Sequence, residues 1–79
     1  MSYKSIKAYR FVYVDNLNMY KYYVWFIALT HKQARYFWWR YIQNNHIRHY
    51  EWNAVDIKDV SDHDYKVGDL YYDHEILHY

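Results

Sequence analysis

The stretch "THKQARYFWWRYIQNN", residues 30–45, has the pattern of an amphipathic helix with a defined start and end. Thr30 and Gln33 have the spacing of a capping box, in which each side chain accepts a hydrogen bond from a free backbone N–H group. Asn44 and Asn45 end the pattern. The apolar residues between these ends recur three and four positions apart, and they form a stripe to lay across a sheet: Ala34, Phe37, Trp38, Tyr41 and Ile42.

Two strands are predicted before this helix. Residues 4–14 alternate between two faces, as the side chains of a strand do. Residues 15–18, "DNLN", favour a turn, and residues 19–29 are apolar on both faces, as expected for a central strand. We therefore expect a hairpin. Its first strand has an aliphatic face and an aromatic face, the latter made by Tyr3, Tyr9, Phe11 and Tyr13.

Two further strands are predicted after the helix. Residues 47–58, "IRHYEWNAVDIK", give a third strand with a less regular alternation. Residues 65–72, "YKVGDLYY", give a fourth strand at an edge, with Gly68 at a bend or bulge. We therefore predict an α+β fold with the element order ββαββ. It has one antiparallel sheet of about four strands and a single helix packed on one face.

The length and composition favour one compact domain spanning residues 1–79. A chain of this size has room for one core, and no cysteine is present to cross-link it or to supply a thiolate metal ligand. The 13 Tyr, 4 Trp and 3 Phe residues provide ample core material. Because one small core cannot enclose all of these rings, we expect some of them to face a partner.

Charge is distributed unevenly along the chain. Residues 1–58 hold nine Lys and Arg against three acidic residues, a net charge of +6. Residues 59–79 hold one Lys against six acidic residues, a net charge of −5. We therefore expect an acidic C-terminal segment, from about residue 59, that is attracted to the basic part of the chain. Such a segment can also be a solvated edge, or dock on a basic protein surface.

The sequence shows no pattern of export or membrane insertion. Its first residues lack the basic-then-apolar layout of a signal peptide. The longest apolar run, residues 22–29, is far shorter than the roughly 20 residues of a membrane span. We expect a cytoplasmic protein without a membrane partner.

The helix positions that point away from the apolar stripe combine aromatic rings with cations. They are Lys32, Arg35, Tyr36, Trp39 and Arg40, followed by the polar Gln43. A tryptophan beside an arginine is typical of the hot spot of a protein interface. The same residue types also suit a single-stranded nucleic acid, whose bases stack on rings and whose phosphates pair with cations. In a third interpretation, Trp39 packs under a strand or the C-terminal tail, and the cations are ordinary solubilising groups.

The aromatic face of the first strand invites a similar comparison. Tyr3, Tyr9, Phe11 and Tyr13 fall on one face, with Lys7 and Arg10 among them in the sequence. Aromatic and basic residues interleaved on a sheet are typical of single-strand RNA binders, although the near-neutral net charge disfavours this. If the helix covers the opposite face, these rings are free for a second molecule, and homodimerisation through the sheet is the other option.

The C-terminal stretch "DHEILHY", residues 73–79, contains the pattern H-E-x-x-H of zinc metalloproteases. On a helix, His74 and His78 would lie on one face, with Glu75 placed to activate a bound water. A catalytic zinc needs a third protein ligand, and only Tyr79 follows His78. We therefore expect no cofactor and no catalytic residue, and we keep His74 and His78 only as candidate metal ligands.

These observations favour a binding protein over an enzyme, because a domain with one helix and one sheet has little room for a deep pocket. The predicted function is a small non-enzymatic module that inhibits or modulates one intracellular partner protein. The alternatives are a single-stranded nucleic-acid binder and a histidine-based metal-binding protein. In its size, lack of cysteine and abundance of Tyr, Asn and Lys, the chain resembles small bacteriophage-encoded inhibitors of host or defence proteins. That resemblance implies a location in the host cytoplasm.

Overall fold

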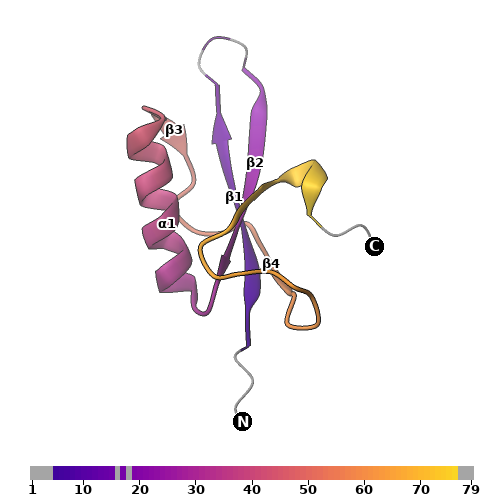
Figure 1. Cartoon of the computed structure of the whole chain (residues 1–79). Coiled ribbons are helices and arrows are strands. Elements are labelled where there is room, and N and C mark those ends of the chain that lie inside the picture. The colour runs from indigo at the N-terminus through magenta and orange to yellow at the C-terminus, as the bar shows by residue number, and fades with distance from the viewer. Residues whose placement is uncertain (1–4, 16, 18, 77–79) are drawn as a thin grey trace.

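The computed structural model describes residues 5–15, 17 and 19–76 of the chain. Its centre is a long antiparallel hairpin of β1, Lys7–Val14, and β2, Lys21–Ala28 (Figure 1). The predicted hairpin is confirmed. At its turn the Asp15 carboxylate accepts a hydrogen bond from the Leu17 N–H (2.8 Å), as in an Asx turn.

Three short strands complete the sheet on either side of the hairpin. The strands β3, His49–Tyr50, and β4, Asp56–Asp59, both pair with β1, while β5, Leu70–Tyr72, pairs with β2. All pairings are antiparallel, and the 3₁₀ turn η1, Asp73–Glu75, follows β5. The described residues thus form an α+β fold with one antiparallel sheet of five strands and one α-helix.

The predicted third strand is divided by a loop at residues 51–55. The ends of this loop stay beside β1, because the Glu51 N–H donates to the Val12 carbonyl (3.0 Å) and the Val55 N–H donates to the Arg10 carbonyl (2.7 Å). The irregular alternation of this segment therefore reflects two short strands with an insertion between them. The predicted fourth strand is likewise shorter, since residues 65–69 form a turn before β5.

Helix α1, His31–Asn44, begins and ends where the sequence predicts. The Gln33 N–H donates to the Thr30 hydroxyl oxygen (3.1 Å), and the Gln33 side-chain oxygen accepts from the Leu29 N–H (2.8 Å). The reciprocal arrangement therefore forms, with the backbone donor one residue earlier than in the standard capping box. At the other end, the Asn45 side-chain amide donates to the Tyr41 carbonyl (2.9 Å).

Helix α1 packs on the aromatic face of the hairpin, and the main core lies between them (Figure 1). Trp38 is completely buried at its centre. Its ring stacks on Phe11 (5.1 Å between centroids), and its indole N–H donates to the Glu51 carbonyl (2.8 Å). The buried residues of this core are Tyr9, Phe11, Val24, Phe26, Ala28, Ala34, Trp38 and Ile42.

The predicted exposure of the aromatic strand face is therefore wrong. Tyr9 is 3% exposed, Phe11 is completely buried, and Tyr13 is partly buried against the same core. The helix covers this face because its neighbours on β2 are also apolar: Val24 and Phe26 lie on the same side of the sheet. This face is not free for a second copy of the chain or for a nucleic acid.

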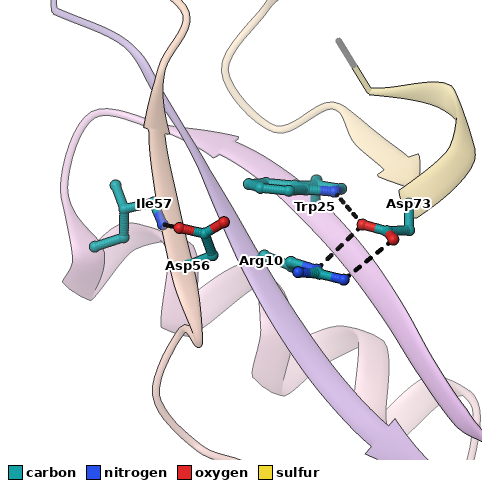
Figure 2. Close-up of polar contacts among 5 residues, drawn as sticks. All are labelled: Arg10, Trp25, Asp56, Ile57 and Asp73. Atoms are coloured by element: carbon teal, nitrogen blue, oxygen red, sulfur yellow. Dashed lines mark hydrogen bonds and ion pairs between the residues drawn. The ribbon is translucent and has the colours of Figure 1, made fainter. Parts of the chain in front are cut away.

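Part of the acidic C-terminal segment packs on the face of the sheet opposite the helix, while Leu70 of the same segment packs against the main core (Figure 1). A second buried cluster forms on the face opposite the helix from Ala8, Trp25, Ile27, Val60 and Ile76. Figure 2 shows how Asp73 joins the segment to the hairpin. Its carboxylate accepts hydrogen bonds from the Arg10 guanidinium (3.1 Å) and the Trp25 indole N–H (2.9 Å). The predicted attraction between the basic and acidic parts of the chain is realised in this contact.

Replacing Gly68 by alanine is expected to destabilise the fold by about 1–2 kcal/mol, because Gly68 has a φ of +95° that a residue with a Cβ adopts at a cost. A steric clash adds little, since the new Cβ would lie 3.9 Å from the Phe37 ring. Urea unfolding measures the change, with the exposed Val67→Ala as a control expected to stay within about 0.5 kcal/mol. Equal midpoints for the two variants would refute the backbone argument.

His31 links α1 to the 51–55 loop in a way that depends on pH. Its ring stacks on Tyr9 (5.5 Å), and its Nε2 accepts a hydrogen bond from the Ala54 N–H (3.0 Å), which requires that nitrogen to be unprotonated. Burial, and secondarily the Arg35 charge, lower the pKa of His31 below its ordinary value of 6.5. The unfolded chain therefore takes up this proton more readily than the folded chain.

The stabilisation from neutral His31 is accordingly complete above about pH 6.5 and declines as the pH falls below that value. We expect the free energy of unfolding to drop more steeply between about pH 7 and pH 5 in the wild type than in His31→Gln. The other histidines are present in both proteins, so their contributions to the pH dependence cancel when the two profiles are compared. Parallel profiles for the two proteins would contradict this role of His31.

Candidate binding surface on the outer face of the helix

The outer face of α1 carries the aromatic and basic residues that the sequence pattern predicts for it. Lys32, Tyr36, Trp39 and Arg40 are exposed and Arg35 is partly exposed. Trp39 is 47% exposed, although its neighbour Trp38 is completely buried. The interpretation that tucks Trp39 under a strand or the tail is therefore wrong.

Trp52 belongs to the same surface and was not predicted. It lies in the 51–55 loop, is 42% exposed, and lines a shallow groove together with Lys32, Arg35, Tyr36 and Trp39. The groove has a volume of about 390 Å³. The alternating pattern had placed Trp52 in the predicted third strand, and only the irregularity of that pattern could have indicated a loop. We call these five residues and Arg40 the helix-face surface.

The groove wall formed by the 51–55 loop is held in place by contacts with α1. The Trp38 indole N–H bonds to the Glu51 carbonyl, and His31 bonds to the Ala54 N–H. The Arg35 guanidinium donates to the Asn53 side-chain oxygen (3.2 Å) on the same loop. The groove is therefore formed before any partner arrives, which reduces the entropy lost on binding.

The helix-face surface carries positive charge that nearby acids do not neutralise. Helix α1 contains no Asp or Glu. Within residues 5–15, 17 and 19–76, the ion pairs found join Arg10 to Asp73 and His74 to Glu75, so none involves a cation of the helix-face surface. An aromatic floor among unneutralised cations suits an acidic or polar partner with an apolar anchor.

The residues predicted on the first strand do not contribute to this surface. Tyr9 and Phe11 lie inside the main core, beneath the helix whose opposite side carries Trp39. Tyr13 packs near Trp38 (6.1 Å between centroids) and Tyr41 (6.2 Å). The predicted site thus separates into a surface group from the helix and a core group from the strand.

A larger hollow of about 690 Å³ lies elsewhere, against the β1–β2 hairpin and residues 48–51. Arg10, which lines it, lies over the Tyr23 ring (3.9 Å) and is paired with Asp73. The Arg10 Nε is 3.1 Å from Asp73, close enough for ion pairing but not aligned for a hydrogen bond. This arrangement joins the sheet to the C-terminal segment.

The structure describes only one of the two C-terminal histidines. The His74 side chain is 81% exposed and lies 3.9 Å from Glu75, while His78 lies outside the described residues. The described part of the chain contains no group of three His, Asp or Glu side chains placed to hold a metal ion. A metal site through His78 therefore stays a prediction.

Comparisons of the chain with protein-family models, with curated proteins and with solved structures found no match. None of the helices formed by the described residues has the length and apolarity needed to cross a membrane. The function must therefore be argued from the helix-face surface itself.

Proposed function

We propose that this protein is a small non-enzymatic module that binds one partner protein through the helix-face surface and so inhibits or modulates that partner. The observation that carries the proposal is the exposure of Trp39 and Trp52 on a preformed groove. Both are solvent-exposed although the fold buries two other tryptophans, Trp25 and Trp38. Neither Trp39 nor Trp52 belongs to either of the two buried clusters.

Physical chemistry supports a protein as the ligand. Tryptophan, tyrosine and arginine dominate interface hot spots: the two aromatic side chains supply large contact areas at a small entropic cost, and arginine supplies directed hydrogen bonds. The helix-face surface contains all three residue types. The general resemblance to small phage-encoded inhibitors favours a host or defence protein in the cytoplasm as the target.

A single-stranded nucleic acid is the weaker alternative. Its best support was the aromatic face of the first strand, and that face is buried under α1. The net charge of +1 also provides little of the phosphate neutralisation that drives such binding. What remains in its favour is the helix-face surface alone.

Affinity capture tests the proposal. The tagged protein is used as bait in a bacterial lysate, with and without nuclease, and retained proteins are identified by mass spectrometry. We expect one protein in stoichiometric amount after nuclease treatment. Recovery that disappears with nuclease would transfer the proposal to nucleic acid, and metal in the purified bait would point to the histidines instead.

A further inference from the structure

The charged residues of the helix-face surface are all basic. No acidic residue occurs between Asp15 and Glu51, a stretch that includes all of α1. In the acidic C-terminal segment, Asp73 bonds to Arg10 and to Trp25, which belongs to the cluster on the face opposite the helix. Among the described residues, no ion pair joins a carboxylate to Lys32, Arg35 or Arg40, so the groove keeps its positive charge.

Two cations, Lys32 and Arg35, line the groove, and Arg40 follows four residues after Tyr36, which also lines it. Lys32, Tyr36 and Arg40 follow one another at intervals of four residues, so they form one row that rises about 12 Å along the axis. Arg35 lies in the neighbouring row, and its guanidinium is held toward the groove wall by Asn53 (3.2 Å). One cationic group is thus positioned in advance, next to the aromatic floor.

We infer that the helix-face surface binds an acidic segment of the partner protein, an inference that rests on the proposed function. An apolar side chain of that segment fits between Trp39 and Trp52, and its carboxylates pair with Arg35, Arg40 and Lys32. Arginine suits this task because its planar guanidinium binds a carboxylate through two parallel hydrogen bonds. Carboxylates about two helical turns apart, or about four residues apart in an extended strand, match the row of cations.

The same geometry disfavours a nucleic acid. Affinity for a phosphate backbone grows with the number of phosphates neutralised, and the three cations of α1 are confined to little more than two helical turns. A short acidic peptide needs only the two or three carboxylates that this surface can pair.

The test uses three synthetic probes, each titrated against the whole protein while the tryptophan indole signals are followed by NMR. They are a short peptide with glutamates spaced around one leucine, the same peptide with glutamine in place of each glutamate, and an oligothymidylate. We expect the glutamate peptide to bind about tenfold more tightly than the glutamine peptide, with the difference shrinking at high salt. Equal binding, or no binding of the glutamate peptide, overturns the inference, and tighter binding of the oligothymidylate replaces it with a nucleic-acid ligand.

Variants of the protein test whether the glutamate peptide binds at the helix-face surface. Arg35→Gln and Arg40→Gln are each expected to weaken binding of the glutamate peptide about three- to tenfold, while Lys66→Gln, in the C-terminal segment, leaves it unchanged. Circular dichroism confirms that each variant is folded. If Arg35→Gln and Arg40→Gln leave binding intact while Trp39→Ala still weakens capture of the partner, the acidic-segment inference fails and the proposed function stands. If Trp39→Ala does not weaken capture, the proposed function itself fails.

Discussion

Replacing Trp38 by alanine is expected to destabilise the fold by about 3–5 kcal/mol, the largest effect of any single change considered for this chain. Trp38 is completely buried, stacks on Phe11 and Tyr41, and donates its indole N–H to the Glu51 carbonyl. Removing it leaves a cavity under the helix and takes away one of the hydrogen bonds that hold the 51–55 loop. In a domain of 79 residues, whose total stability is of the same order, the variant should be largely unfolded.

Two controls separate the parts of this effect. Trp38→Phe keeps most of the ring stacking but removes the hydrogen bond to Glu51, so it should retain the fold with a smaller loss of stability. Trp39→Ala, one position along, should cost much less stability than Trp38→Ala and leave the protein folded, because that ring is half exposed and belongs to neither buried cluster. Thermal unfolding followed by circular dichroism compares the three. A folded Trp38→Ala, or an unfolded Trp39→Ala, would reverse the assignment of core and surface.

Replacing Trp39 by alanine is instead expected to weaken binding of the captured partner by about 30-fold or more. Alanine in place of a hot-spot tryptophan typically costs about 2 kcal/mol or more of binding free energy, and each 1.4 kcal/mol is a factor of ten. The variant keeps its fold, so the loss reports on contact with the partner. Surface plasmon resonance against the identified partner gives the ratio directly.

The matched control for this binding experiment is Tyr20→Ala. Tyr20 is also an exposed aromatic residue, at 64%, but it lies just before β2, away from the helix-face surface. It should leave the affinity within about twofold of the wild type. Equal losses for Tyr20→Ala and Trp39→Ala would mean that the binding surface extends to the hairpin, or lies there.

The helix and the hairpin could be predicted because local chemistry determines them. Thr30 and Gln33 cap the start of α1, Asn45 closes its end, and the stripe from Ala34 to Ile42 gives its buried side. In the same way, the turn at Asp15 and the apolar strand after it define the hairpin. In each case the groups that form the cap or the turn are only a few residues apart along the chain.

The choice of sheet face could not be predicted in this way. Both faces of the hairpin are apolar, with Phe11 and Phe26 on one side and Trp25 and Ile27 on the other. Either face can accept a helix, and the aromatic one does so. Tyr9 and Phe11, predicted to meet a partner, are buried for this reason.

Long-range contacts account for the remaining differences. The link between Arg10 and Asp73 spans 63 residues, and no local pattern shows that the acidic segment crosses the sheet face opposite the helix. Trp52 reaches the groove because Asn53 and Ala54 bond to α1, a contact between segments about 20 residues apart. Charge imbalance predicted that the basic and acidic parts attract each other, but not the place where they meet.

The most direct test of the proposed function is an NMR titration of the isotopically labelled protein with the captured partner, in which the four tryptophan indole N–H signals are followed. Two of these rings are exposed on the groove, Trp39 and Trp52, and two are buried, Trp25 and Trp38. We predict that the signals of Trp39 and Trp52 shift or broaden strongly, while those of Trp25 and Trp38 change little. A partner that binds but leaves Trp39 and Trp52 unchanged would contradict the account.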